Sequence, residues 1–191
     1  RVESVQNAFR LLASQLTKDD RVTLVSFART SRLLADRVAG DEVVKLVDLV
    51  EGTPSEGGTN LEQALELGMA KAREQKLEGG QNRIILITDG AANLGNAKPA
   101  ELAKMVENMR QQGIAFDACG VGAEGYNDEI LESLTRKGDG RYYFLDRPED
   151  ADGGFAEQIA GALRPAARNV KVQVNFNPKR VGRYKLYGFE K

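Results

Sequence analysis

The stretch RIILITDGAAN, residues Arg83 to Asn93, decides the fold that the sequence predicts. Four consecutive apolar residues, Ile84 to Ile87, predict a strand buried on both faces, as the strands of parallel sheets are. Asp89 and Gly90 follow directly, so a carboxylate is expected where the strand ends and the chain turns. Sites in open α/β sheets gather at the carboxyl ends of strands, which makes Asp89 a candidate site residue.

Strands and helices alternate around this stretch. The alternation predicts an α/β fold, a doubly wound and mostly parallel sheet with helices on both faces. Apolar spacing predicts a first helix from about Val2 to Leu16. The further helices are expected at Asp41–Val50, Asn60–Lys76, Pro99–Gln112, Asp128–Lys137 and Pro148–Leu163, and the strands at Arg21–Phe27, Thr30–Ala35, Arg83–Thr88, Ile114–Val121 and Arg141–Leu145.

The end of the chain has a different pattern. Apolar and polar residues alternate from Val170 to Phe176, which predicts a half-exposed strand. The turn-like NPKRVG and a second candidate strand, Tyr184–Phe189, complete a β-hairpin. We therefore predict an α/β domain over residues 1–166 and a C-terminal β-hairpin extension over residues 167–191.

Composition excludes several classes of function. Lys and Arg number 27 against 28 Asp and Glu, so the net charge of −1 gives no electrostatic reason to bind nucleic acid. The chain has no histidine, which excludes Ser-His-Asp and Cys-His catalysis and His-based metal sites. The single cysteine, Cys119, lies in an apolar segment and is expected to be a buried hydrophobe. No run approaches the roughly 20 apolar residues of a membrane span, so we expect no membrane insertion.

A second candidate site residue lies in the loop GTPSEGGT, Gly52 to Thr59, which leads into a helix. A hydroxyl from Thr59 and a carboxylate from Asp89 are expected at one rim of the sheet, and oxygen ligands suit a hard ion such as Mg²⁺. Gly57 and Gly58 would let the loop backbone approach that ion. Each residue also has a structural interpretation: Asp89 begins a turn, and Thr59 fits the N-cap of a capping box with Glu62.

Five motifs in order resemble the von Willebrand factor type A (vWA) family, in a bacterial subgroup with a C-terminal β extension. They are GGTN at 57–60, RIILITDG at 83–90, DRVTLVSFA at 20–28, GVGAEGYNDEILESL at 120–134 and VKVQVNFNP at 170–178. The resemblance implies a metal-ion-dependent adhesion site (MIDAS) in a binding module that is not an enzyme. Thr59 would bind the ion directly and Asp89 directly or through water, with Gly57, Gly58, Asn60 and Gly90 in the site loops. A partner protein would complete the coordination with an Asp or Glu.

One part of the family pattern is absent. The resemblance implies an Asp-x-Ser-x-Ser motif on a first central strand, and these 191 residues contain no such motif. That strand would lie between Arg21–Phe27 and Arg83–Thr88, so its absence leaves a slot about 10 Å wide with unpaired backbone on both sides. The Val170–Phe176 strand is a poor substitute, because its polar face would be buried.

The first residue is Arg1 and not Met, so we take it as an internal point of a longer protein. We expect that protein to supply the strand and its three oxygen ligands, and to be extracytoplasmic or membrane-anchored in a bacterium. Binding of Mg²⁺, or of Mn²⁺ or Ca²⁺, by these residues alone is expected to be weak or absent.

The sequence admits three other interpretations. GVGAEG, Gly120 to Gly125, matches a dinucleotide-binding fingerprint, and Asp146 follows about 20 residues later. Against it, the following helix opens with Asn127, Asp128 and Glu129, and the two acids place negative charge where a pyrophosphate would bind. A phosphoacceptor role for Asp89 lacks the acidic pair and the lysine that such a site needs. A purely structural vWA domain with no bound ion is the remaining alternative.

Overall fold

The computed structural model describes residues 2–54, 57–58, 60–88, 98–121, 128–145, 161 and 172–185. Its elements follow the predicted order of strands and helices. The helices are α1 (Val2–Ser14), α2 (Val43–Glu51), α3 (Leu61–Glu74), α4 (Pro99–Gln111) and α5 (Asp128–Lys137), and the strands are β1 (Arg21–Phe27), β2 (Ser31–Ala39), β3 (Asn82–Thr88), β4 (Ile114–Val121) and β5 (Tyr142–Leu145).

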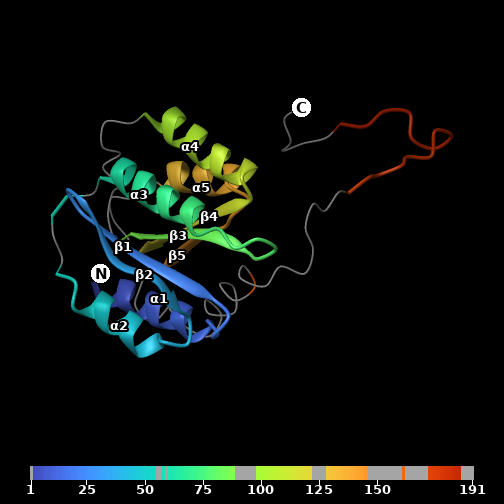
Figure 1. Ribbon diagram of the computed structural model, residues 1–191. Helices are drawn as coiled ribbons and strands as arrows, with labels where there is room; N and C mark the ends of the chain where they lie inside the picture. Colours follow the sequence, from blue (N-terminus) through green and yellow to red (C-terminus); the bar gives the residue numbers. More distant parts are fainter. Residues whose placement is uncertain are drawn as a thin grey trace.

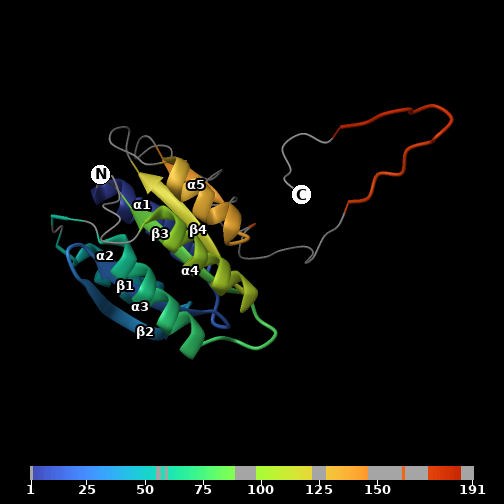
Figure 2. The same ribbon diagram turned by 90° about the horizontal axis from the view of Figure 1, so that it is seen from above.

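The elements form three layers, with the strands in the middle (Figure 1). Helices α1 and α2 cover one face of the strand layer, and α3, α4 and α5 cover the other, as Figure 2 shows from above. This confirms the predicted α/β class with helices on both faces. In the described part of the chain, no helix has the length and apolar character that a membrane span requires.

The strand layer is divided into two sheets. Strands β3, β4 and β5 form a parallel sheet in that order, with Ile85 opposite Asp117 and Cys119 opposite Tyr143. Strands β1 and β2 form a separate antiparallel pair. Within the described residues, β1 pairs only with β2, and β3 pairs only with β4. The division therefore falls between β1 and β3, where the family resemblance implies a further strand.

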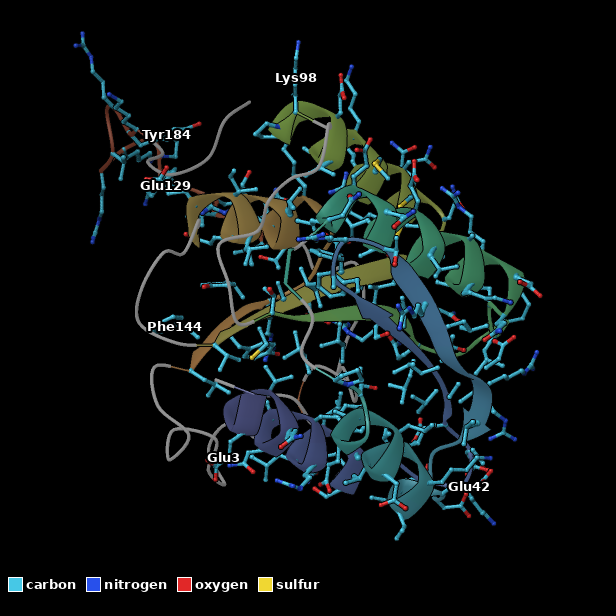
Figure 3. The ribbon with its side chains drawn as sticks, turned by 90° about the vertical axis from the view of Figure 1, so that its left-hand side faces the viewer. Glu3, Glu42, Lys98, Glu129, Phe144 and Tyr184 are labelled. Atoms are coloured by element: carbon cyan, nitrogen blue, oxygen red, sulfur yellow. The ribbon has the colours of Figure 1, made fainter. Side chains whose placement is uncertain are left out.

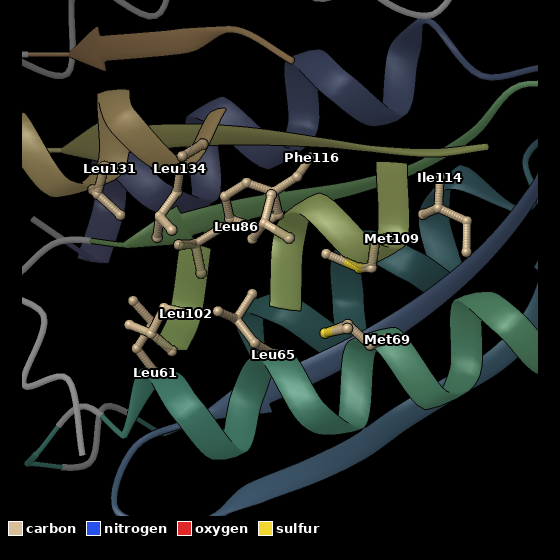
Figure 4. Packing of buried hydrophobic residues seen from close by; sticks show 12 residues of the cluster. Leu61, Leu65, Met69, Leu86, Leu102, Met109, Ile114, Phe116, Leu131 and Leu134 are labelled. Carbon is tan, nitrogen blue, oxygen red and sulfur yellow. The ribbon is translucent and has the colours of Figure 1, made fainter. Parts of the chain in front are cut away.

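Each face of the strand layer has its own apolar core. The core beneath α3, α4 and α5 contains Leu65, Leu102 and Leu134 together with Phe116 of β4 (Figure 4). The core on the other face joins α1 and α2 to the strands; its buried residues are Ala8, Phe9, Leu12, Ala13, Ala35, Leu46, Cys119, Val121, Tyr143 and Leu145. Strand β4 contributes to both cores, which explains its continuous apolar sequence.

The described part of the C-terminal segment has the predicted turn but no strand at residues 172–176, and most of the second predicted strand, Tyr184–Phe189, lies outside the described residues. The backbone N–H groups of Arg180 and Val181 donate to the carbonyl oxygen of Asn177, both at 2.9 Å, and the rings of Phe176 and Tyr184 stack with centroids 4.4 Å apart. Residues 172–185 contain no β-ladder, so the predicted hairpin is wrong for this described part. A two-stranded hairpin is only marginally stable unless one of its faces packs on the rest of the protein. Val172 is 87% exposed, so this face is not packed. The helix predicted at Pro148–Leu163 lies almost wholly outside the described residues.

Candidate functional site

Contacts at the two ends of helix α3 show the relative directions of β1 and β3. At its amino end, the N–H of Asn60 donates to the carbonyl oxygen of Ala28, directly after β1, at 2.7 Å. At its carboxyl end, Thr23 near the start of β1 donates its hydroxyl to the side chain of Gln75 at 2.6 Å. Helix α3 therefore runs antiparallel to β1. Strand β3 starts near this same end of α3, where Asn82 exchanges hydrogen bonds with the backbone of Leu77. β1 and β3 thus run in the same direction.

The residues that flank the two candidate ligands consequently lie at one rim of the strand layer. Gly58 and Asn60 stand on either side of Thr59, and Thr88 ends β3 directly before Asp89. Gly58 and Thr88 line the same cleft. Thr59, Asp89 and Gly90 themselves lie outside the described residues, so their proximity stays a prediction.

Helix N termini gather at this carboxyl rim. Each parallel strand ends here, so α4 and α5 begin here, and α1 and α3 begin here because each ends where the next strand starts. Figure 3 labels Glu3, Lys98 and Glu129 at the starts of α1, α4 and α5. The positive ends of four helix dipoles favour a negatively charged group at the rim, such as a partner's carboxylate.

The capping role predicted for Thr59 belongs to its neighbour. Helix α3 begins at Leu61, and its N-cap is Asn60, whose Oδ1 accepts a hydrogen bond from the N–H of Gln63 at 3.1 Å. The predicted capping box with Thr59 at the N-cap is therefore wrong by one residue. Asparagine caps a helix as well as threonine does, and it reaches the third helical N–H in the same way. The structural alternative for the Thr59 hydroxyl is weakened accordingly.

The loop backbone requires glycine at position 58 but not at position 57. Gly58 has φ +93°, and a Cβ added there would lie 2.9 Å from Cγ of Arg29. Gly57 has open space around it, with no atom within 4 Å of an added Cβ. Only Gly58 is needed for the path of this loop, since a side chain there would be strained whatever the surroundings.

A buried ion pair holds the other end of β3. The Arg83 guanidinium donates from Nε to Oδ2 of Asp117 at 2.7 Å and from Nη2 to Oδ1 at 2.9 Å. The backbone N–H of Arg141 adds a third hydrogen bond to Oδ1 at 2.7 Å. Burial, followed by the charge of Asp117, raises the pKa of Tyr143. No local sequence pattern indicates this ion pair, because Arg83 and Asp117 are far apart in the sequence.

A second cluster of charged and polar side chains lies near the start of β1. Lys71 of α3 pairs with Asp36 at 3.1 Å and with Glu74 at 3.0 Å, and Gln75 also donates to Asp36. The hydrogen bond from Gln75, and then that from Lys71, lowers the pKa of Asp36. Glu74, and then Asp36, raises the pKa of Lys71. These exposed contacts join α3 to β2 and lie away from the carboxyl rim.

The candidate ligands at the rim are oxygen atoms, which suit a hard cation, but they are too few to hold one tightly. In the described residues, no group of three or more Asp, Glu or Cys side chains is placed to hold a metal ion. The candidate ligands are therefore the hydroxyl of Thr59 and the carboxylate of Asp89. Oxygen donors suit Mg²⁺, but two protein ligands hold it weakly without help from further oxygens.

Comparison with known proteins identifies the family. The model of the von Willebrand factor type A domain matches residues 1–159, more than half of the chain. The chain belongs to the von Willebrand factor type A domain family. A second family model, described as the C-terminal part of the uncharacterized protein YfbK, matches residues 161–191. The boundary between the two matches lies near the predicted domain boundary.

Individual relatives agree with this assignment. The uncharacterized protein YfbK of Escherichia coli (strain K12) is 30% identical over all 191 residues, and the match spans 33% of that protein. A vWA structure from Catenulispora acidiphila covers 85% of this chain and 38% of its own at 17% identity, with a TM-score of 0.72. Proximal thread matrix protein 1 of the mussel byssus, with a zinc-occupied MIDAS motif, covers 82% and 39% at 20% identity, with a TM-score of 0.62. The two structures show the fold alone. The chain spans about a third of the length of the E. coli relative.

Proposed function

We propose that this vWA domain binds another protein through a divalent metal ion at the carboxyl rim of its strand layer. In this proposal, Thr59 binds the ion through its hydroxyl oxygen, and Asp89 binds it directly or through water. An Asp or Glu of the partner completes the coordination. The chain acts as a binding module and not as an enzyme.

One observation carries the proposal. The hydrogen bond from Asn60 to the carbonyl oxygen of Ala28 fastens the residue after Thr59 to the end of β1. Since β1 and β3 run in the same direction, Thr88, the residue before Asp89 in the sequence, belongs to the same rim. The zinc-occupied MIDAS motif of the mussel protein supports metal binding as a property of this fold.

The identity of the ion follows from the donor chemistry. Hydroxyl and carboxylate oxygens suit Mg²⁺, Mn²⁺ or Ca²⁺, and the absence of histidine and of a cysteine cluster argues against a soft metal. Two protein ligands leave most of the coordination shell to water and to the partner. Ion binding by the 191 residues alone is therefore expected to be weak.

Calorimetric titration with Mg²⁺ and Mn²⁺ tests the proposal. We expect heat of binding from a version extended upstream of Arg1, and little or none from the 191 residues alone. Thr59→Ala and Asp89→Ala should abolish the heat in the extended version. Asp19→Asn, an exposed acid that precedes β1 at the opposite rim, is the matched control and should leave it unchanged.

Two results would contradict the proposal. Heat from neither version would favour a structural domain with no bound ion. A melting temperature that rises with NAD⁺ but not with Mg²⁺ would instead support the GVGAEG motif, of which Gly122–Gly125 lie outside the described residues.

A further inference from the structure

We propose that residues 172–185, which we call the basic arm, adsorb to the surface of an anionic lipid membrane without spanning it. The basic arm lies apart from the three layers of helices and strands in both ribbon views (Figures 1 and 2). It carries four of the seven exposed large apolar side chains of the described residues, namely Val172, Val174, Phe176 and Tyr184. The inference is independent of any ion at the carboxyl rim.

One side of the basic arm is apolar. Nε2 of Gln173 donates to Oδ1 of Asn175 at 3.1 Å, so these two polar side chains lie on the same side of the chain. Val172, Val174 and Phe176 alternate with them in the sequence, as apolar residues do on the opposite side of an extended chain. Polar and apolar side chains are therefore separated, which is the arrangement that an interface between water and lipid favours.

The second half of the basic arm adds an aromatic ring to this apolar side. The ring of Tyr184 stacks on that of Phe176, with centroids 4.4 Å apart. Tyr184 is nevertheless 72% exposed, and Val174 is 65% exposed. Tyrosine is enriched where one end of a side chain meets an apolar layer and the other end meets water. The apolar side is therefore large enough to gain from being covered, and the described residues leave it open.

The charges of the basic arm all have one sign. It contains four of the 27 Lys and Arg residues of the chain and none of its 28 Asp and Glu residues. The four are Lys179, Arg180, Arg183 and Lys185. Since the whole chain has a net charge of −1, the rest of it carries an excess of acid. The small net charge thus conceals a local concentration of positive charge.

These cations are available to an external anion. Among the described residues, no ion pair involves Lys179, Arg180 or Arg183. Asn177 holds the first two at the turn, because its side-chain Oδ1 accepts from the N–H of Lys179 and its carbonyl oxygen accepts from the N–H of Arg180, both at 2.9 Å. The turn therefore presents positive charge directly beside the apolar side.

An anionic membrane fits this combination better than a protein pocket or a nucleic acid does. A lipid surface offers dense negative charge above an apolar layer, and it requires no fixed shape of the segment that binds. The basic arm has no β-ladder in its described residues, so a protein pocket would have to order it at an entropic cost. In the aromatic pair, each ring covers one face of the other, which leaves fewer faces for nucleotide bases to stack on.

Co-sedimentation of the 191-residue chain with lipid vesicles tests the proposal. The vesicles are phosphatidylcholine alone, or phosphatidylcholine with about 30% phosphatidylserine, in about 0.05 M and 0.5 M NaCl. EDTA is present throughout, so neither a bridging calcium ion nor an ion at the rim contributes. We expect binding to the anionic vesicles at low salt, a large loss of binding at high salt, and little binding to phosphatidylcholine alone.

Charge variants locate the binding segment. Each cation near an anionic surface strengthens adsorption about fivefold, so Lys179→Gln combined with Arg180→Gln should weaken it about 30-fold. Lys104→Gln combined with Lys137→Gln removes the same charge from exposed positions on α4 and α5, and it should weaken adsorption by no more than about twofold. An unchanged urea midpoint verifies that each variant is folded.

An apolar variant separates adsorption at the lipid interface from attraction by charge alone. Phe176→Ser combined with Tyr184→Ser keeps every charge but should weaken adsorption at least about tenfold, because the apolar side no longer gains from leaving water. Binding that stays unchanged in this variant would show that the arm does not reach the apolar layer, and would overturn the proposal.

Further results would also overturn it. They are the absence of binding to anionic vesicles at low salt, equal binding to both kinds of vesicle, and an equal loss of binding in the two pairs of charge variants. If vesicles do not bind, but the chain associates with itself or with an RNA oligonucleotide and loses that association in the arm variants, the basic arm belongs to that partner instead.

Discussion

Replacing Arg83 with methionine is expected to destabilise the fold by about 3–5 kcal/mol, because the change leaves a buried carboxylate without its partner. The side chain of Asp117 is only 1% exposed and that of Arg83 only 12%. Methionine retains much of the apolar length of arginine, so lost packing contributes little to the expected effect.

The magnitude follows from the hydrogen bonds. Of the three hydrogen bonds that described residues donate to Asp117, Arg83 supplies two, and the backbone N–H of Arg141 supplies the third. A hydrogen bond to a charged group is worth about 1.5–3 kcal/mol, so the loss of two gives about 3–6 kcal/mol, a range that includes the roughly 3–5 kcal/mol typical of a broken buried ion pair. A pair exposed at the surface would give at most about 1 kcal/mol.

Urea denaturation followed by circular dichroism measures the effect, and a double-mutant cycle isolates the pair. Asp117→Leu removes the buried charge but leaves the Arg141 N–H without its acceptor, at a cost of about 1–3 kcal/mol. The double variant should therefore be more stable than the sum of the single effects predicts, by at least about 1 kcal/mol. Single effects that add within about 0.5 kcal/mol, or a cost below about 1 kcal/mol for Arg83→Met, would refute the reasoning.

Three further predictions concern single residues. Asn60→Ala should lower the free energy of unfolding by about 1 kcal/mol, because it removes the cap of α3, whereas Asn60→Asp should preserve it; equal urea midpoints would contradict this role. Gly58→Ala should cost at least about 1 kcal/mol because of its positive φ, whereas Gly57→Ala should stay within about 0.5 kcal/mol, and the reverse order would be inconsistent with the loop. Burial raises the pKa of the Cys119 thiol from 9.0 to about 12, so its contribution to stability is complete below pH 9. The free energy of unfolding should then fall by up to about 4 kcal/mol as the pH rises toward 12. Urea titrations of Cys119→Ala should not show this fall.

Local patterns were sufficient to predict most elements. The bounds of β1, β4 and α5 match the prediction residue for residue, and α4 and β3 each differ by one residue. In each case the signal lies within the segment itself: a run of apolar residues for β4, and helical spacing for α5. The predicted burial of Cys119 is also confirmed, since its side chain is buried in the core that joins α1 and α2 to the strands.

Features set by distant partners could not be predicted from such patterns. Strand β2 extends to Ala39, beyond the predicted Ala35, because pairing with Arg21 at the start of β1 holds its end in place. The pairing of the Asp117 carboxylate with Arg83 on the neighbouring strand likewise depends on the register of the sheet.

The candidate site shows the same limit. Two features of the sequence indicate Thr59 and Asp89. One is the pairing of a hydroxyl with a carboxylate, and the other is the expectation that two strands end at one rim. The strand directions support that expectation, but the cap on Asn60 was missed, since both residues at the start of α3 are good caps. The strands predicted in the tail depend on packing that residues 172–185 do not show, because alternation alone does not bury a face.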